Sequence, residues 1–267
     1  MLRIAMARQR RTRLLELENN MTSQTGLITL ALPCYNEADN IVSVMQASIV
    51  ELEKLGRPWE LIVIDNHSSD RTAEVVQEFI QTESRVRLIV HPENKLYSGS
   101  CATALREARG ELVAIMDSDR QFSAVDLPRM IASLEAGANL VIGWRKERHD
   151  PFARKLMSAV FNAMGKFWLG FPLHDLNCGI RMFDRKFIEV AEIRHRINMV
   201  NPEMYVRAYN AGLRLDEVVI THAERTEGQT SHDFRKSYHI FMTVNTYFRT
   251  LKGEKRKREV TVGYREA

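Results

Sequence analysis

Apolar positions in the first half of the chain alternate between two spacings. Short unbroken apolar runs, which are typical of buried strands, occupy residues 27–33, 59–65, 86–91, 112–117 and 139–144. Between these runs, apolar residues recur every three or four positions, which predicts helices over 39–55, 70–81, 100–109 and 126–136. Strands that alternate with helices predict right-handed βαβ units and a mostly parallel sheet. We therefore expect an α/β fold that binds ligands at the carboxyl ends of its strands.

The second half of the chain is less regular. Its spacing predicts helices over 152–169, 202–211 and 238–251, with strands near 179–183 and 215–221. No internal repeat or low-complexity linker interrupts the pattern. We expect one domain over residues 26–251, between a basic N-terminal tail (1–25) and a basic C-terminal tail (252–267).

Composition narrows the class of protein only slightly. The 267 residues are 45% hydrophobic and 27% charged, which is ordinary for a globular protein with one large core. The net charge of +4 suits a phosphorylated substrate or an anionic membrane surface but requires neither. No apolar run approaches the ~18 residues of a membrane span. The three cysteines are widely spaced and odd in number, so we expect reduced thiols and a cytoplasmic protein.

Three of the expected strands end in acids and amides. The segments are Pro-Cys-Tyr-Asn-Glu at 33–37, Asp-Asn-His-Ser-Ser-Asp at 65–70 and Asp-Ser-Asp-Arg-Gln at 117–121. Some of these residues can cap the helix that follows, and we interpret Asp70 mainly as such a cap. Capping does not explain Asp117 and Asp119, which are separated by one residue and followed by Gln121.

Two adjacent carboxylates repel each other unless a cation lies between them. Carboxylate and amide oxygens suit a hard ion, so we expect Mg²⁺ or Mn²⁺ at Asp117, Asp119 and Gln121. Such an ion would offset the charge on a departing nucleoside diphosphate.

These strand ends resemble those of family 2 glycosyltransferases with the GT-A fold. The nearest pattern is that of the dolichol-phosphate mannosyltransferase and polyprenyl-phosphate glycosyltransferase group. Residues 33–37 match its Pro-x-Tyr-Asn-Glu motif, and residues 117–121 match its Asp-x-Asp-x-Gln motif. Residues 65–72 match Asp-Asp-Gly-Ser-x-Asp-x-Thr, except that Asn66 and His67 replace the usual Asp-Gly.

The resemblance continues downstream, so that it spans residues 27–232. Arg145 follows the fifth strand as in the group, and Arg154, Ser158 and Asn162 fit a helical Arg-x3-Ser-x3-Asn pattern. Residues 177–183 resemble its Ser-Gly-Phe-Arg-x-Phe segment.

The resemblance implies roles for individual residues. The nucleoside of a nucleotide-sugar donor would contact Pro33, Tyr35, Asn36, Glu37 and Asp65. Asp117, Asp119 and Gln121 would hold the metal and the diphosphate, with Asp119 as a catalytic residue. The acceptor would contact Arg145, Arg154, Ser158 and Arg225, although a solvated surface charge is the plainer interpretation of any single arginine. Residues 26–146 would thus form a nucleotide-sugar half and residues 147–251 an acceptor half.

One departure concerns the acceptor. The group usually ends in Arg-x-x-Gly-x-Ser-Lys, whereas here Thr230 and Ser231 replace the serine and the lysine after Arg225. A phosphate-binding cation is therefore missing unless His232 or Lys236 substitutes for it.

Two acceptors remain open, and they need different chemistry. A lipid phosphate is ionised near neutral pH and needs no protein base, since the second pKa of a phosphate monoester is ~6. A hydroxyl on a soluble acceptor needs a general base. Asp175 is the candidate, with His174 and His222 as weaker ones, and the alternative is that Asp175 only orders its loop.

Other classes of protein fit less well. A nucleotidylyltransferase or a dinucleotide-dependent enzyme would have a glycine-rich turn where residues 33–37 lie. A non-catalytic nucleotide-binding protein would not need the metal motif. We expect no nucleic-acid partner, leave a homo-oligomer open, and expect any peripheral contact with the inner face of a membrane to use the basic termini.

Overall fold

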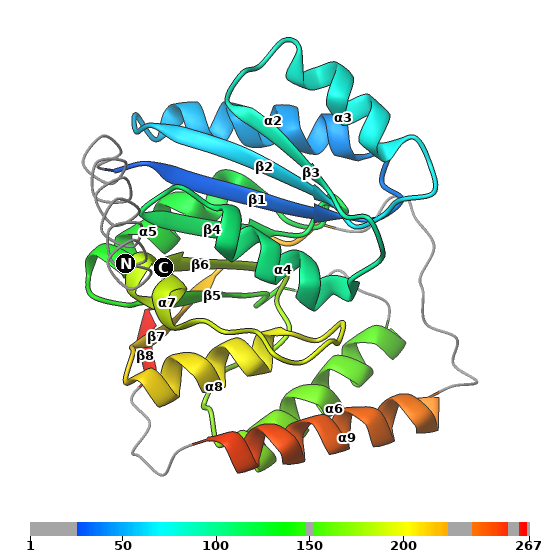
Figure 1. Ribbon diagram of the computed structural model, residues 1–267. Helices are drawn as coiled ribbons and strands as arrows, with labels where there is room; N and C mark the ends of the chain where they lie inside the picture. Colours follow the sequence, from blue (N-terminus) through cyan, green and yellow to red (C-terminus); the bar gives the residue numbers. More distant parts are fainter. Residues whose placement is uncertain (1–25, 148–151, 224–236, 256–261, 266–267) are drawn as a thin grey trace, which may run out of the picture.

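The apolar runs of the first half form strands of one sheet in the computed structural model, which describes residues 26–147, 152–223, 237–255 and 262–265 (Figure 1). The strands are β1 (Ile28–Cys34), β2 (Trp59–Asp65), β3 (Val86–Val90), β4 (Leu112–Met116) and β5 (Leu140–Trp144). Every residue of β1 and β2 is buried, which explains why their sequences read as continuous apolar runs. The order of strands in the sheet is β3-β2-β1-β4-β6-β5-β7-β8. This arrangement confirms the predicted α/β class with a mostly parallel sheet.

The second half of the chain adds three strands to the same sheet. β6 (Ile180–Asp184) runs antiparallel between β4 and β5, with Ile180 opposite Met116. β7 (Leu215–Val219) pairs in parallel with β5, and β8 (Val262–Arg265) pairs in parallel with β7. β8 lies in the segment that we expected to be a basic tail. Its four residues, Val-Gly-Tyr-Arg, are too few to give a periodic signal.

Helices cover both faces of the sheet, with α2 and α3 on one face and α4 on the other (Figure 1). α4 begins four residues before the predicted helix, and α7 is a short helix that the spacing did not predict. The helices are α2 (Ile41–Lys54), α3 (Thr72–Ile80), α4 (Leu96–Glu107), the 3-10 turn η1 (Ala124–Asp126), α5 (Leu127–Glu135), α6 (Phe152–Leu169), α7 (Arg185–Val190), α8 (Asn201–Ala211) and α9 (Ser237–Glu254).

α6 and α9 pack against each other along one border of the molecule, away from β1–β3 (Figure 1). Phe161 of α6 meets Phe248 of α9 at a ring separation of 5.1 Å. Neither helix is long and apolar enough to cross a membrane, and the same holds for the other helices within the described ranges.

Candidate functional site

The carboxyl ends of β2, β1 and β4 lie next to one another, because these strands are neighbours in the sheet. Cys34 at the end of β1 is level with Asp65 at the end of β2. The Ser118 hydroxyl, just after β4, donates to the Pro33 carbonyl over 2.9 Å. The three polar segments found in the sequence therefore meet at one edge of the sheet.

Several hydrogen bonds join the loop after β1 to the loop after β2. The Asn36 amide donates to the Ser68 hydroxyl (2.9 Å), and the Asn36 side-chain oxygen accepts from the Ser69 amide (2.8 Å). The Glu37 amide donates to the Thr72 hydroxyl (2.9 Å), and the Ala38 amide donates to Asp70 (3.2 Å). The two segments thus form one ordered surface.

Asp70 also accepts from the amide of Thr72, the first residue of α3, at 3.0 Å. The N-cap position itself is Arg71, which makes no side-chain capping bond, so the expected cap lies one residue before the cap position. Slight burial acts in the opposite direction, but the hydrogen bonds from Thr72 and Ala38 lower the pKa of Asp70.

Each of the three strand-end loops contains one residue in the left-handed region. These residues are Asn36 (φ 55°), His67 (φ 66°) and Arg120 (φ 63°). Asparagine adopts this conformation readily, whereas histidine and arginine do so at some cost. His67 stands where the family motif has glycine, and the backbone keeps the shape that glycine favours.

The candidate nucleoside residues differ in how far they reach solvent. Tyr35 is half exposed at the rim of the site. Asp65 is buried, and its carboxylate accepts from the Ser68 amide (3.2 Å) and from the Ser68 hydroxyl. In this structure Asp65 therefore orders the loop that follows β2.

Asp117 is held by residues from two other elements. The Tyr97 hydroxyl of α4 donates to its Oδ1, and the Arg181 guanidinium of β6 donates to the Tyr97 oxygen over 2.5 Å. Its Oδ2 lies against Gly179, where an added Cβ would be only 2.2 Å away. Burial raises the pKa of Asp117 to about 6, although the charge of Arg181 acts in the opposite direction.

Arg181 is fully buried. Besides Tyr97 it donates to the Cys178 carbonyl (3.2 Å) and to the Cys101 sulfur (3.1 Å). A buried guanidinium needs a compensating charge, and Asp117 provides a carboxylate nearby. Sequence reasoning missed Tyr97, because its position before a predicted helix gave no sign of its partner twenty residues away.

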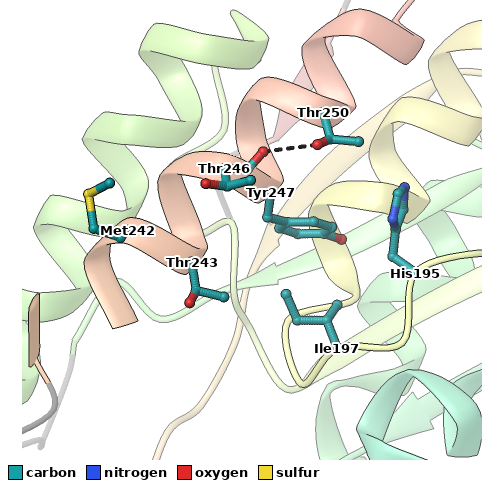
Figure 2. Close-up of a pocket in the computed structure, with 7 residues that line it drawn as sticks. All are labelled: His195, Ile197, Met242, Thr243, Thr246, Tyr247 and Thr250. Atoms are coloured by element: carbon teal, nitrogen blue, oxygen red, sulfur yellow. Dashed lines mark hydrogen bonds between the residues drawn. The ribbon is translucent and has the colours of Figure 1, made fainter. Parts of the chain in front are cut away.

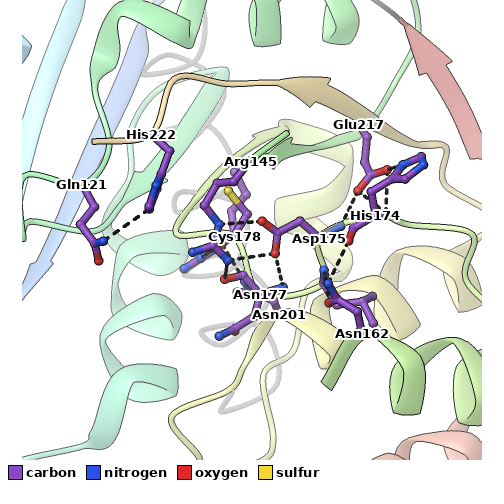
Figure 3. A network of polar contacts seen from close by, with 12 residues as sticks. Gln121, Arg145, Asn162, His174, Asp175, Asn177, Cys178, Asn201, Glu217 and His222 are labelled. Carbon is purple, nitrogen blue, oxygen red and sulfur yellow. Dashed lines mark hydrogen bonds and ion pairs between the residues drawn. The ribbon is translucent and has the colours of Figure 1, made fainter. Parts of the chain in front are cut away.

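The other residues of the Asp-x-Asp-x-Gln motif bond to one another and to α2. The Gln121 amide donates to Asp119 over 3.2 Å, and the Arg120 side chain donates to Ser43 of α2 (3.0 Å). The Gln121 side chain approaches the buried imidazole of His222 at 3.4 Å (Figure 3). Phe122 meets the same ring edge-on, so His222 belongs to this site.

Asp117 and Asp119 fit a hard divalent cation that is completed by other oxygen donors. Two carboxylates separated by one residue stand at the end of a buried strand, and Gly179 leaves room beside one of the oxygens. No cluster of three or more acidic, histidine or cysteine ligands occurs among the residues that the structure describes. Such a pair suits Mg²⁺ or Mn²⁺, which commonly use one or two carboxylates and substrate phosphates.

Arg145, which directly follows β5, forms a two-pronged ion pair with Asp175 (Figure 3). The Arg145 Nε and Nη2 donate to the two oxygens of Asp175 over 2.6 and 2.9 Å. Arg145 also donates to the Asn177 carbonyl (3.1 Å), and both side chains are largely buried. Because both oxygens of Asp175 accept from Arg145, the geometry favours a role in ordering the loop over a role as base.

A second carboxylate, Glu217 of β7, supports the same loop. It is buried and accepts from the amides of His174 (2.8 Å) and Asp175 (3.1 Å). The His174 Nδ1 lies 2.8 Å from Glu217, and the ring stacks on Trp144 at 4.1 Å. The sequence gave no signal for Glu217, which is 43 residues from His174.

Helix α6 reaches the same loop through Asn162. Its side chain donates to the His174 carbonyl (2.9 Å) and accepts from the Leu176 amide (3.1 Å) (Figure 3). Ser158 is half-buried one turn earlier. The side chain of Arg154 and all of Arg225, Thr230, Ser231, His232 and Lys236 lie outside the described residues.

A pocket of about 450 Å³ lies between α9 and the segment around His195 and Ile197 (Figure 2). α9 contributes Tyr247 and three threonines to its lining. It contains none of the predicted site residues and no carboxylate, so it is separate from the strand-end site.

Known proteins resemble this chain over most of its length. A family model described as "Glycosyl transferase family 2" matches residues 29–191. The undecaprenyl-phosphate 4-deoxy-4-formamido-L-arabinose transferase of Proteus mirabilis is 27% identical over 224 residues, which cover 84% of this chain and 68% of that protein. The dodecaprenyl-phosphate galacturonate synthase of Rhizobium johnstonii is 26% identical over 224 residues, covering 81% and 65%.

Solved structures share the fold. The glucosyl-3-phosphoglycerate synthase of Mycobacterium tuberculosis, solved with Mn²⁺ and UDP-glucose, has a TM-score of 0.64 at 19% identity, with 89% of this chain and 82% of that chain covered. A mannosyltransferase of Pyrobaculum calidifontis with GDP-mannose and Mn²⁺ has a TM-score of 0.54 at 20% identity, covering 85% and 72%. The expected GT-A fold is thereby confirmed.

Proposed function

The chain belongs to glycosyl transferase family 2, and from that premise we propose that it moves a sugar from a nucleotide diphosphate-sugar to a polyprenyl-phosphate acceptor. The family makes it a glycosyltransferase, as the strand-end motifs predicted. The donor, the metal and the acceptor are the parts that we propose.

The proposal that the protein binds a nucleotide-sugar donor rests on one observation. The polar ends of three strands lie together at one place in the structure. The segments after β1 and β2 are fastened together beside Asp117 and Asp119. Solved structures of the same fold hold UDP-glucose or GDP-mannose with Mn²⁺, which supports the same pair of ligands here. When bound, Mg²⁺ or Mn²⁺ would be held by the Asp117 and Asp119 carboxylates and would offset negative charge on the departing diphosphate.

We therefore assign donor binding to residues 26–146. Contacts within the protein order this part of the site before the donor binds. Tyr97, Arg181 and Gly179 fix where the Asp117 carboxylate stands. The Asn36, Ser68 and Thr72 bonds fix the rim on which we place the nucleoside. Such preorganised side chains favour catalysis, because they need little rearrangement when the donor binds.

The Arg145–Asp175 ion pair favours a phosphate acceptor. As the base for a hydroxyl acceptor, Asp175 would have to accept a proton while both of its oxygens accept hydrogen bonds from Arg145. A phosphate acceptor is already an anion and needs no base. The two curated relatives described above carry polyprenyl phosphates in their names, which supports the same acceptor class for residues 147–251 of this chain. Catalysis would then take place at the inner, cytoplasmic face of a membrane.

A soluble hydroxyl acceptor remains the second candidate, and one observation favours it. The His174 imidazole is partly exposed and is oriented by the buried Glu217 over 2.8 Å, which is the arrangement of a histidine base. His174→Ala would then abolish transfer to a hydroxyl, whereas transfer to a lipid phosphate would persist.

Asp119→Ala tests the metal and donor assignment. We expect transfer to fall by at least about a hundredfold, because charge stabilisation of the leaving group is lost. Stabilisation of the protein by UDP or GDP with Mn²⁺ in a thermal shift assay should be lost as well. Glu74→Gln provides the control, since Glu74 is an exposed carboxylate of α3 that pairs with Arg71, and it should leave turnover unchanged. Wild-type turnover in the Asp119 variant would refute the assignment.

A further inference from the structure

The outer face of α6 is apolar where a surface helix is normally polar. Leu156, Val160, Ala163 and Phe167 follow one another at spacings of four, three and four residues, so they form one stripe along the helix. All four are exposed, Leu156 by 54% and Phe167 by 75%. We call these four residues the α6 stripe.

The α6 stripe is not part of the core. The opposite side of α6 packs inward through Phe161 and Gly165, which meet Phe248 of α9 and Leu176. α6 is therefore apolar on two opposite sides, and only one of them is covered by the protein.

Basic side chains flank the α6 stripe on both sides. Lys155 and Lys166 are exposed and stand eleven residues, about three turns, apart on one side of α6. On the other side, Trp168 lies beneath two exposed cations of α9. Arg249 is 5.9 Å and Lys252 is 5.1 Å from the centre of its ring.

Acidic residues are almost absent from the two helices. Their sequences contain a single carboxylate, Glu254 at the end of α9. The Glu254 carboxylate pairs with Arg207 at 2.8 Å and with His195 at 2.9 Å. The face around the α6 stripe therefore combines exposed apolar side chains with positive charge that no neighbouring acid of these helices offsets.

We propose that the α6 stripe lies in the surface of an anionic lipid bilayer, with Lys155, Lys166, Arg249 and Lys252 at the level of the head groups. An apolar helical face with basic flanks is the arrangement of a helix that lies in the plane of a membrane interface. This docking face adds to any membrane contact of the basic termini, and it rests on the proposed function in that a polyprenyl-phosphate acceptor lies in a bilayer.

Electrostatics favours a bilayer over a second copy of the chain. A symmetric pair of protomers would place the same face against itself, so that lysine and arginine on one protomer would approach those on its partner. Anionic head groups instead provide a negative surface opposite the four cations.

The position of α6 links this face to the candidate site. Asn162, on the inner side of α6, binds the backbone on both sides of Asp175, and Asp175 pairs with Arg145. One helix thus touches the membrane with its outer side and the acceptor half of the site with its inner side.

Cosedimentation of the full chain with lipid vesicles tests the docking face. The wild-type protein should bind vesicles of equimolar phosphatidylglycerol and phosphatidylcholine and bind pure phosphatidylcholine more weakly. Phe167→Ser and Leu156→Ser should each weaken partitioning by about tenfold, since each removes one large apolar side chain from the bilayer. Lys166→Gln should weaken binding to the anionic vesicles by about fivefold and leave binding to phosphatidylcholine unchanged.

Val50→Ser is the matched control. Val50 lies on α2, far from α6, and is exposed by 54%, the same as Leu156. This variant should bind vesicles like the wild type. Equal binding by wild type and the α6 stripe variants would overturn the proposal. A dimer that Phe167→Ser dissociates, without vesicle binding by the wild type, would overturn it too and assign the face to a second copy.

An assay with a short-chain, water-soluble prenyl phosphate as acceptor tests the docking face and the proposed function independently of each other. The α6 stripe variants should keep wild-type turnover on this acceptor without membranes, and lose turnover on the long-chain acceptor in vesicles. If no prenyl phosphate is glycosylated but vesicle binding follows the pattern above, the proposed function fails and the docking face stands. If the short-chain acceptor is used but the variants bind vesicles normally, the docking face fails and the function stands.

Discussion

The absence of a side chain at Gly179 decides where the carboxylate of Asp117, the proposed metal ligand, can lie. A Cβ there would lie 2.2 Å from Asp117 Oδ2 and 2.4 Å from the Phe122 ring, so Gly179→Ala must displace one of them. We expect turnover to fall by about a hundredfold, since a displacement of about 1 Å at a reacting group has that effect. Steady-state kinetics, with circular dichroism to show a retained fold, would measure it.

Gly253→Ala is the control for that variant, because nothing lies within 4 Å of a Cβ at Gly253 in α9. It should keep full turnover and stability. Wild-type turnover of Gly179→Ala would show that the contact with Asp117 is unimportant.

His67 holds a backbone conformation that suits glycine better than histidine. Its φ of 66° disfavours a side chain, and a left-handed residue other than glycine costs roughly 1–2 kcal/mol. His67→Gly should therefore leave the free energy of unfolding unchanged or raise it by up to about 1 kcal/mol, because the greater freedom of glycine in the unfolded chain offsets part of the gain. His67→Val should lower it by about 1–3 kcal/mol. Urea unfolding of both variants measures this, and a large loss on His67→Gly would mean that the imidazole itself is needed.

At the scale of elements, Asn162 connects α6, the proposed docking helix, to the loop around Asp175. Asn162→Ala leaves the His174 carbonyl and the Leu176 amide without their partner and should lower the free energy of unfolding by about 1–3 kcal/mol. It should also raise the KM for the acceptor while the KM for the donor stays unchanged, because we assign the Asp175 loop to the proposed acceptor half.

Asn245→Ala separates the two effects. The Asn245 side chain accepts a hydrogen bond from the Trp168 indole over 3.0 Å, which joins α9 to α6 and not to the loop, so its loss should lower stability without changing the KM for either substrate. If Asn162→Ala changed the KM for the donor and the KM for the acceptor equally, the assignment of the Asp175 loop to acceptor binding would be wrong.

Elements differed in how well the sequence predicted them. β1, β2 and β4 are buried runs with helices between them, and their polar ends were recognised from spacing alone. The direction of β6 was not predicted, because a short apolar run carries no information about which way it pairs. Arg181 lies in the segment that resembles the family, but its partner Tyr97 was not predicted, and neither was Glu217. These residues support the site through partners that are far apart in the chain, and no local pattern marks such partners.

The free energy of unfolding of the whole molecule depends on pH. The buried His91 contributes to this dependence. Its ring lies 2.9 Å from Asn66 and 2.9 Å from Thr103, and burial, followed by the charges of Lys95 and Arg106, lowers the pKa of His91. Below the unfolded pKa near ~6.5, the unfolded chain binds a proton that the folded chain does not. Protonation of His91 therefore has no effect on the free energy of unfolding at higher pH, and it lowers that free energy as the pH falls through about 6.5.

Urea unfolding at pH 7.5 and pH 5.5 tests this, with pH values chosen about one unit on either side of that pKa. His91→Gln should show a smaller loss of stability between the two than the wild type. An identical loss in both proteins would mean that other groups cause the acid sensitivity.

The antiparallel β6 ties the two halves of the chain into a single folding unit. β4 and β5 come from the first half, yet the strand between them comes from residues 180–184. A polypeptide cut near residue 147 would leave β4 and β5 apart, each with an open edge prone to aggregation. Coexpressed with the remaining segment, it would regain β6 by strand insertion and reassemble. The enzyme is thus suited to fragment complementation, and chimaeras between relatives can exchange halves only if the foreign β6 completes the resident sheet.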